Sequence, residues 1–247
     1  MSVRVFENTR IVLVATSHPG NIGATARAMK TMGLHNLWLV RPRAFPSAEV
    51  TARAAGADDI LSRARVVASV SEAVADCGLI LATTARSRGL AWPELSPADG
   101  AAQLIAAAAA GTQVAVVFGN ERSGLSNEEL EFCQGAIRIP TDRDYSSLNL
   151  AAAVQIICYE LRKQLSEATP AAVEPEAPLA TGAQLEQFYQ HLEQCLIAIG
   201  FYDPDKPMLL MRRLKRLFNR AQLDANEYNI LRGILAAAQQ GAKARKD

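Results

Sequence analysis

The sequence lacks the features that identify several common classes of protein. Its 247 residues carry 26 basic and 25 acidic side chains, so the net charge of +1 does not by itself indicate a nucleic-acid binder. No apolar run approaches the ~20 residues that a membrane span requires, which predicts a soluble, cytoplasmic protein. Nearly half of the residues are apolar, enough for one sizeable core and a smaller second unit.

Cysteine and histidine are few and scattered. The four cysteines lie far apart in apolar or helical sequence, without a C-x-x-C pair: Cys77, Cys133, Cys158 and Cys195. We expect buried free thiols rather than disulfides or a zinc site. No H-E-x-x-H motif occurs among the three histidines, so no metal site is predicted. A G-x-G-x-x-G fingerprint and a P-loop are also missing, which ranks a nucleotide-dependent oxidoreductase last.

Short apolar runs rich in β-branched residues alternate with helical patterns. The runs cover residues 10–16, 36–40, 79–84, 114–119 and 136–140. Because each run is continuous rather than alternating, each strand is expected to be buried on both faces, as in a parallel sheet covered by helices. The sequence therefore predicts an α/β fold, with helices at Asn21–Met32, near residues 71–76, after Ser126 and from about Ser147 to Leu165.

Composition divides the chain into three parts. Residues 1–165 hold the alternating strands and helices. Residues 166–181 contain three prolines, three acids and no aromatic side chain, which predicts a flexible linker. Residues 182–247 carry three helical patterns with ten basic and seven acidic groups, so this extension is the positive part of the molecule.

Three polar loops follow predicted strands, where ligands bind in open parallel sheets. They contain "NIGATARAMKTMG", "VFGNERSGL" and "YSSLNLAAAVQI". Each has an ordinary explanation when taken singly: a turn with a solvated arginine, a glycine turn before a helix, and a helix cap. These explanations leave Asn120, Glu121 and Arg122 without a role.

In this order, the three loops resemble the three motifs of the SPOUT superfamily of RNA methyltransferases, in its ribose 2′-O-methylating branch. The match spans residues 10–160. Further stretches are similar to members that methylate cytidine or uridine at position 32 of the tRNA anticodon loop: "ATSHPGN", "NLWLV", "ARSRGLAWP", "LKRLFNRA" and "EYNILRGIL".

The resemblance implies a deep trefoil knot in the C-terminal part of the sheet domain, which periodicity does not predict. It implies a homodimer through the knot, with residues of one chain near the other's cofactor. The cofactor would be S-adenosylmethionine, and the residues matching its cradle are Thr83, Thr84, Ala85, Gly119, Ile139, Ser146, Ser147 and Leu148. Small residues would let the backbone reach the ligand, and Ile139 and Leu148 would offer an apolar slot for the purine.

The resemblance also implies a polar catalytic set, which maps onto Asn21, Arg27, Glu121, Ser147 and Asn149. The family proposal makes Arg27 assist deprotonation of the ribose 2′-hydroxyl. An arginine is normally a donor, so clamping a phosphate and stabilising the developing alkoxide is the alternative role. Glu121 is expected to orient an arginine or the incoming ribose.

A basic helix in the extension is the candidate surface for RNA. Residues 206–223 carry six basic side chains and no acid, with Leu210, Leu214, Leu217 and Ala221 on one face of a helical wheel. A solvated surface helix is the plain alternative. With the family resemblance we expect phosphate contacts from Arg212, Arg213, Lys215, Arg216 and Arg220, and further contacts from Arg86 and Arg88.

Two other functions stay open at this point. The substrate could be another tRNA or ribosomal RNA ribose, or the chain could be a non-catalytic RNA-binding protein of the same fold. The presence of all three polar loops argues against the second, and binding of S-adenosylmethionine would separate the two.

Overall fold

A single parallel sheet organises the N-terminal part of the chain. The computed structural model describes residues 2–84, 93–167, 177–205 and 209–243. Seven strands are ordered β3-β2-β1-β6-β4-β7-β5, and each recorded pairing of neighbouring strands is parallel. The strands are β1 (Thr9–Val14), β2 (Asn36–Val40), β3 (Arg65–Val67), β4 (Leu79–Thr83), β5 (Glu94–Leu95), β6 (Val114–Phe118) and β7 (Gly135–Ile137).

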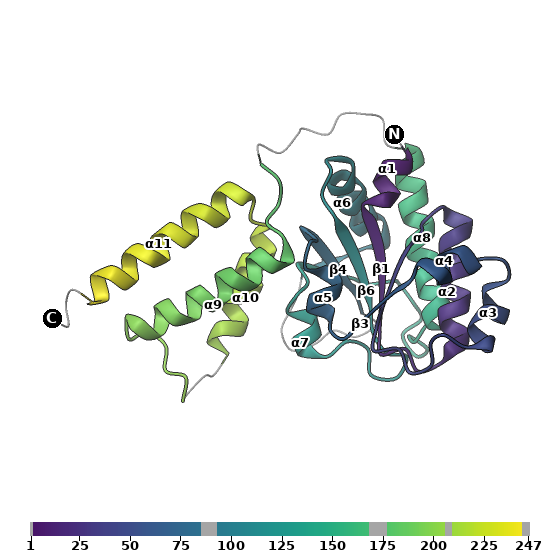
Figure 1. The fold of residues 1–247 in the computed structure, drawn as a ribbon, viewed down its shortest axis with the longest axis horizontal. Helices are drawn as coiled ribbons and strands as arrows, with labels where there is room; N and C mark the ends of the chain where they lie inside the picture. Colours follow the sequence, from purple (N-terminus) through teal and green to yellow (C-terminus); the bar gives the residue numbers. More distant parts are fainter. Residues whose placement is uncertain (1, 85–92, 168–176, 206–208, 244–247) are drawn as a thin grey trace.

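The side chains of each strand alternate between two cores, because successive residues point to opposite faces of a sheet. Along β1, Ile11 and Leu13 belong to one core and Val12 and Val14 to the other. One face is covered by α1 (Ser2–Glu7), α2 (Pro19–Met32), α3 (Ala48–Ala54), α4 (Asp58–Arg63), α6 (Pro97–Ala109) and α8 (Leu150–Glu167). The other face is covered by α5 (Val70–Val74) and α7 (Asn127–Leu130), which lie on the opposite side of the sheet from α2 and α8 (Figure 1).

The predicted parallel α/β fold is confirmed, and all five predicted strands are present. Two strands were not predicted. Strand β3 is a largely exposed edge strand, and β5 has two residues, so neither makes an apolar run. Helix α8 begins at Leu150, three residues later than predicted, because Asn149 accepts hydrogen bonds from the amides of Ala151 and Ala152 as a cap does. The knot stays a prediction, since strand order does not record the path of the chain.

The four cysteines are buried and free, as predicted. Burial raises the pKa of the Cys133 and Cys158 thiols to about 12, so both stay protonated and unreactive at neutral pH. No described helix is both long and apolar enough to span a bilayer.

The C-terminal part consists of α9 (Gly182–Ala198), α10 (Leu210–Ala221) and α11 (Ala225–Lys243), which lie to one side of the sheet domain (Figure 1). They share a small core in which Phe188 of α9 meets Phe218 edge to face at 4.8 Å. The predicted apolar face of α10 was partly wrong. Met211, Leu214 and Phe218 pack against the small core, whereas Leu217 is 46 % exposed.

The segment predicted as a linker has structure at both ends. Helix α8 extends to Glu167, and residues 177–181 lie against the rest of the chain. Ala180 donates to the Leu223 carbonyl, and Gly182 donates to the Cys77 carbonyl at 2.7 Å. Composition could not predict this, because the segment is stabilised by contacts with distant residues. The proposed boundaries at residues 165 and 182 stay a prediction.

Helix α10 contacts the sheet domain at the turn that follows α7. The buried Asn219 side chain donates to the carbonyl oxygens of Glu131, at 2.8 Å, and of Cys133, at 3.3 Å. The Glu131 carboxylate pairs with Arg212 at 3.1 Å and with Lys215 at 3.4 Å. A buried amide paired with backbone carbonyls fixes where the helix sits, since leaving either group unpaired would be costly.

Candidate active site

The site is built where the loops after β1 and β6 meet, because neighbouring parallel strands end at the same edge of a sheet. Glu121, in the loop after β6, accepts hydrogen bonds from the backbone amides of Ser17 and His18 at 2.9 and 3.2 Å. It also accepts from the Ser17 hydroxyl and from the Asn21 side chain, both at 2.8 Å. One carboxylate therefore holds the loop after β1 and the start of α2 together.

The network continues to the third polar loop. The Asn149 side-chain amide donates to Asn21 Oδ1 at 3.0 Å, and Asn149 Oδ1 caps α8. Glu121, Asn21 and Asn149 thus form one directed chain of hydrogen bonds across 128 sequence positions. Because the carboxylate can only accept, the orientation of both amides is fixed.

The Glu121 carboxyl is held in its charged form. Burial alone would raise its pKa, but the hydrogen bonds from Ser17 and Asn21 outweigh burial and lower the pKa from 4.5 to about 2. With four donors already placed, this carboxylate is a positioning group and a very weak base. Among the described residues, the recorded partners of the Glu121 carboxylate are Ser17, His18 and Asn21, and none is an arginine. That Glu121 orients an arginine or the incoming ribose stays a prediction.

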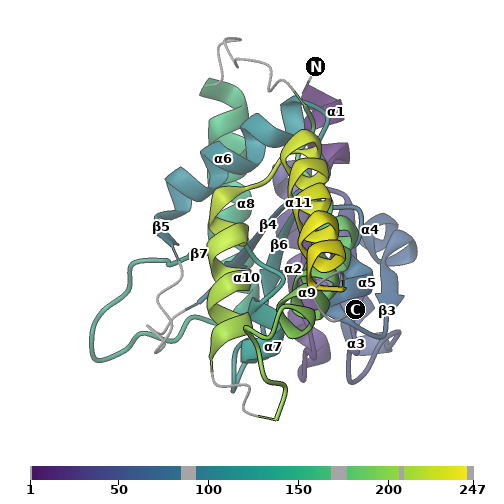
Figure 2. The same ribbon diagram turned by 90° about the vertical axis from the view of Figure 1, so that its left-hand side faces the viewer.

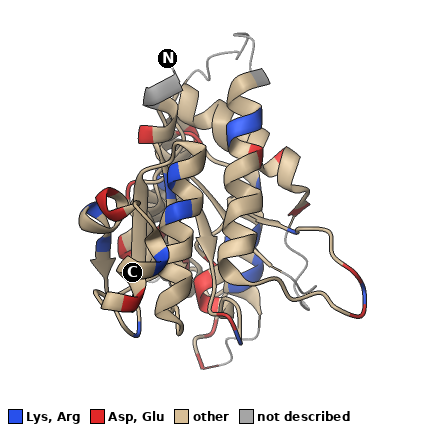
Figure 3. Cartoon of the chain, turned by 90° about the vertical axis from the view of Figure 1, so that its right-hand side faces the viewer, with Lys and Arg blue, Asp and Glu red and all other residues tan. Residues whose placement is uncertain are grey.

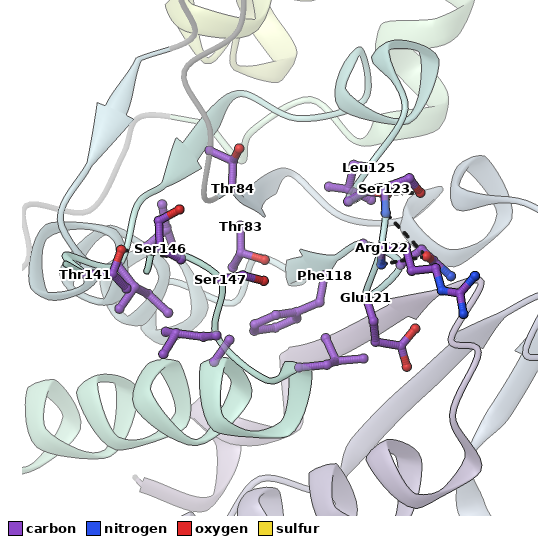
Figure 4. Close-up of a pocket in the computed structure, with 18 of the residues that line it drawn as sticks. Thr83, Thr84, Phe118, Glu121, Arg122, Ser123, Leu125, Thr141, Ser146 and Ser147 are labelled. Atoms are coloured by element: carbon purple, nitrogen blue, oxygen red, sulfur yellow. Dashed lines mark hydrogen bonds between the residues drawn. The ribbon is translucent and has the colours of Figure 1, made fainter. Parts of the chain in front are cut away.

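A cavity opens beside this network, between the ends of β4 and β6 and the loop that precedes α8 (Figure 4). Seven of the eight predicted cofactor residues line it: Thr83, Thr84, Gly119, Ile139, Ser146, Ser147 and Leu148. Ala85, the eighth, lies outside the described residues. Glu121 and Arg122 lie on one side of the cavity, and Thr141 and Ser146 on the other (Figure 4).

The lining suits S-adenosylmethionine in its chemistry. Apolar side chains that the sequence did not single out form one part of the wall: Phe118, Leu125, Leu130, Ile137 and Leu150. Hydroxyl groups of Thr83, Thr141 and Ser147 form another part. An apolar slot suits the purine ring, and the hydroxyls and strand-end backbone supply hydrogen-bonding partners for its polar atoms.

The two glycines of the second loop have a local reason. A Cβ on Gly119 would lie 2.3 Å from the carbonyl carbon of Gly124, and Gly124 has a positive φ of 67°. Asn120 completes the turn by accepting from the Arg122 amide and donating to the Ala15 carbonyl. The glycines let the loop close on itself. Gly119 also lines the cavity, and its predicted approach to the cofactor stays a prediction.

Arg27 stands apart from the network. It lies on an exposed position of α2, and no hydrogen bond or ion pair joins it to another described residue. It is also not among the described residues that line the cavity. The structure therefore brings together Asn21, Glu121, Ser147 and Asn149, but not Arg27, within one chain.

The predicted RNA-binding residues fall into two groups. Arg212 and Lys215 pair with Glu131 of the sheet domain. Arg213 and Arg220 are exposed, and Arg216 is half-buried; helical spacing places these three on one side of α10, here called its outer side. Arg86 and Arg88 lie outside the described residues. On the side of the molecule with α2 and α8, basic and acidic segments are interspersed, without a large region of one sign (Figure 3).

Comparison with known families agrees with this geometry. Residues 8–159 match the SpoU rRNA Methylase family, and residues 183–247 match the C-terminal domain of the tRNA methyltransferase TrmJ. The chain belongs to the SpoU methylase family, which confirms the predicted superfamily. It is therefore a methyltransferase of this family.

The similarity to TrmJ proteins extends over both parts of the chain. A Klebsiella pneumoniae tRNA (cytidine/uridine-2′-O-)-methyltransferase TrmJ is 48 % identical, over 98 % of this chain and all of the relative. A Pseudomonas aeruginosa TrmJ, named for cytidine, uridine and adenosine, is 47 % identical over 97 % of this chain and 96 % of its own. The crystal structure of TrmJ from Z. mobilis superimposes with a TM-score of 0.80 at 35 % identity, covering 93 % of this chain and 98 % of that one.

Proposed function

We propose that the chain transfers a methyl group from S-adenosylmethionine to the ribose 2′-hydroxyl of a cytidine or uridine in tRNA, at position 32 of the anticodon loop. The observation that carries the proposal is the directed chain Glu121–Asn21–Asn149 beside a cavity suited to the cofactor. The base specificity and the tRNA substrate are supported by the names of the similar proteins.

The reaction forms a bond between the ribose oxygen and the methyl carbon, breaks a carbon–sulfur bond and releases the hydroxyl proton. S-adenosylmethionine, when bound, supplies a methyl group activated by a positively charged sulfur. The chain's own task is to hold the ribose oxygen in line with that methyl group and to accommodate the charge that develops on the oxygen.

The polar network suits the positioning task. Glu121, with a pKa of about 2, does not take up the proton at neutral pH. Asn21 and Asn149 each use one amide hydrogen within the network and keep a second one available to donate to the ribose. Ser147, which lines the cavity, adds a hydroxyl near the same edge.

Arg27 would complete the site from a second copy of the chain, in a homodimer through the knot region. Two observations support this. Arg27 is exposed and does not line the cavity of its own chain, and residues 141–149, four of which line that cavity, are all exposed. Within this run Tyr145 is 83 % exposed, and the segment after β7 extends away from the sheet (Figure 2). As a permanent donor, Arg27 would clamp a phosphate and stabilise the developing alkoxide.

The same site could act on another ribose of tRNA or ribosomal RNA. The P. aeruginosa relative is named for adenosine as well, so adenosine is the alternative that a specific observation favours. The cytoplasm is the proposed compartment, since it holds both tRNA and the cofactor.

One experiment tests the function directly. The purified chain is incubated with S-adenosylmethionine and bulk tRNA from cells lacking this activity, and ribose methylation is mapped by position. We expect new methylation at cytidine or uridine 32. Methylation elsewhere would reassign the substrate, and cofactor binding without any methylation would favour a non-catalytic RNA-binding role.

A further inference from the structure

Helix α3 lies beside α2 (Figure 1), and it contacts the first turns of α2. A Cβ on Gly23 would lie 2.2 Å from the Val50 carbonyl oxygen and 2.8 Å from Arg53 Cβ. No larger residue fits at this crossing without moving the backbone. The glycine of the "NIGATAR" stretch is therefore explained by the close approach of α3, which carries Arg53.

The Arg53 side chain lies over the residue that precedes Asn21. A Cβ on Gly20 would lie 3.6 Å from Arg53 Cγ and 3.8 Å from Arg53 Nε. Asn21 in turn donates to Glu121 and accepts from Asn149. The Arg53 guanidinium thus projects beside the turn from which the catalytic amides are presented.

A second arginine reaches the same turn from the segment before α3. The Arg43 backbone amide donates to the Thr16 carbonyl at 3.1 Å, and Thr16 precedes Ser17, which holds Glu121. The segment from residue 43 to residue 53 therefore meets the region from Thr16 to Gly20 at both of its ends. One end is joined by a hydrogen bond, and the other lies close to Gly20. Both arginine side chains are exposed.

These arginines form no ion pair within the described part of the chain. Nearby cations have partners: Arg41 pairs with Glu129 at 2.9 Å, and Lys30 pairs with Asp59 at 2.7 Å. Arg43 and Arg53 have neither an ion pair nor a side-chain hydrogen bond to any described residue. Glu49, one turn before Arg53, also lies near Gly20, but no ion pair is recorded between Glu49 and Arg53. The Arg53 guanidinium lies beside the start of α2, and Arg43 is bonded through its backbone to the loop after β1. Arginines that form no ion pair at such a place are suited to bind an anion from outside the protein.

We propose that Arg53, together with Arg43, binds the phosphate of the RNA strand next to the ribose that is methylated. A guanidinium donates two parallel hydrogen bonds to phosphate oxygens, and a phosphate flanks each ribose in the strand. This contact positions the target nucleotide, whereas the outer arginines of α10 would hold a more distant part of the RNA. The proposal rests on the proposed function, since it takes RNA as the substrate.

The test compares tRNA binding by the full chain and by Arg53→Gln, Arg43→Gln and the double variant over a range of KCl concentrations. Arg63→Gln is the matched control, because Arg63 on α4 is exposed and has no ion pair among the described residues. We expect each of Arg53→Gln and Arg43→Gln to weaken tRNA binding at low salt on the order of fivefold. Each should also reduce the slope of log affinity against log salt by about 0.7 to 0.9.

Binding of S-adenosylmethionine provides the second readout. It should be unchanged in both single variants, and Arg63→Gln should match the unmodified chain in every measurement. The proposal is overturned if the tRNA affinity and the salt slope of Arg53→Gln equal those of the control, or if cofactor binding falls in parallel. Failure of the unmodified chain to methylate tRNA would instead reject the proposed function, so the two failures are distinguishable.

Discussion

At the scale of single residues, the candidate site depends on the hydrogen bonds that hold Asn21 between Glu121 and Asn149. The resemblance selected Asn21, Glu121 and Asn149, and the structure joins these three by hydrogen bonds. Ser17 escaped notice although it donates twice to Glu121, because a serine after a strand has no distinctive pattern. Ser17 and Glu121 are about a hundred positions apart, so their contact depends on the tertiary fold. The residues around either position do not predict it.

Replacing Glu121 by Gln should weaken the hydrogen-bond network that joins the loop after β6 to the loop after β1 and to α2. Glutamine keeps one acceptor oxygen and presents an amide hydrogen to donors, so about two hydrogen bonds to a charged group are lost. We expect a loss of about 1–3 kcal/mol in the free energy of unfolding and a large fall in turnover. Glu128→Gln is the control, since Glu128 is exposed and makes no side-chain hydrogen bond to a described residue. Urea unfolding of both variants gives the comparison.

The same carboxylate predicts a pH dependence. Its pKa is about 2 in the folded chain and 4.5 ordinarily, so its stabilising contribution is complete above pH 4.5 and is lost as the pH falls toward 2. Acid unfolding followed by circular dichroism should therefore show a smaller fall in stability between pH 4.5 and 2 for Glu121→Gln than for the unmodified chain. Identical acid profiles would show that Glu121 is not held in its charged form by this network.

Arg27→Lys tests the arginine that the structure leaves outside its own cavity. A lysine keeps the positive charge but cannot reproduce the planar fork, so we expect unchanged binding of S-adenosylmethionine and at least a tenfold loss of turnover. Arg63→Lys is the control. If each site is shared between two copies, mixing Arg27→Lys with an inactive Glu121→Gln chain should restore some activity. A mixed dimer would then contain one site with both an intact Glu121 and an intact Arg27. Turnover close to normal in Arg27→Lys would remove this residue from the mechanism.

At the scale of elements, continuous apolar runs were sufficient to predict five buried strands and their parallel arrangement. They failed for β3 and β5, which lie at the two edges of the sheet and gain their pairing from a neighbour rather than from their own residues. The sequence placed Gly119 in a loop and Gly23 on a helix, but it did not predict the contacts that require a glycine at either position. Gly119 allows a loop to close and Gly23 allows two helices to touch, and both reasons depend on atoms far away in sequence.

The helix crossing gives a paired prediction. Gly23→Ala would place a methyl group 2.2 Å from a backbone oxygen, so α3 must move, at a cost of about 1–3 kcal/mol. Gly20→Ala meets the end of the flexible Glu49 side chain at 3.1 Å and should cost little. Chemical unfolding of both variants measures the difference. Equal stabilities would contradict the close contact between α2 and α3.

At the scale of the whole molecule, the sequence predicted a positive three-helix extension but not how it meets the sheet domain. Asn219 is the clearest case. Its place on α10 is unremarkable in sequence, yet it is 1 % exposed and joins carbonyl oxygens that lie more than 80 positions earlier. Together with Arg212, Lys215 and Glu131, this contact gives the basic helix a fixed inner side and a free outer side.

This two-sided arrangement predicts that the basic residues of α10 differ in their effect on RNA binding. Replacing Arg213, Arg216 and Arg220 together by Gln should reduce the salt slope of tRNA binding by about 2 to 3, because each would lose one phosphate contact. The unfolding free energy should change little, since these side chains lie on the outer side of α10. Replacing Arg212 and Lys215 by Gln should do the reverse, because it leaves the partly buried Glu131 carboxylate unpaired while removing no outer charge. The contrary result would be an equal change in the salt slope per residue for the two sets. Arg212 and Lys215 would then have to release Glu131 when RNA binds. The contact between α10 and the turn after α7 would in that case break during RNA binding.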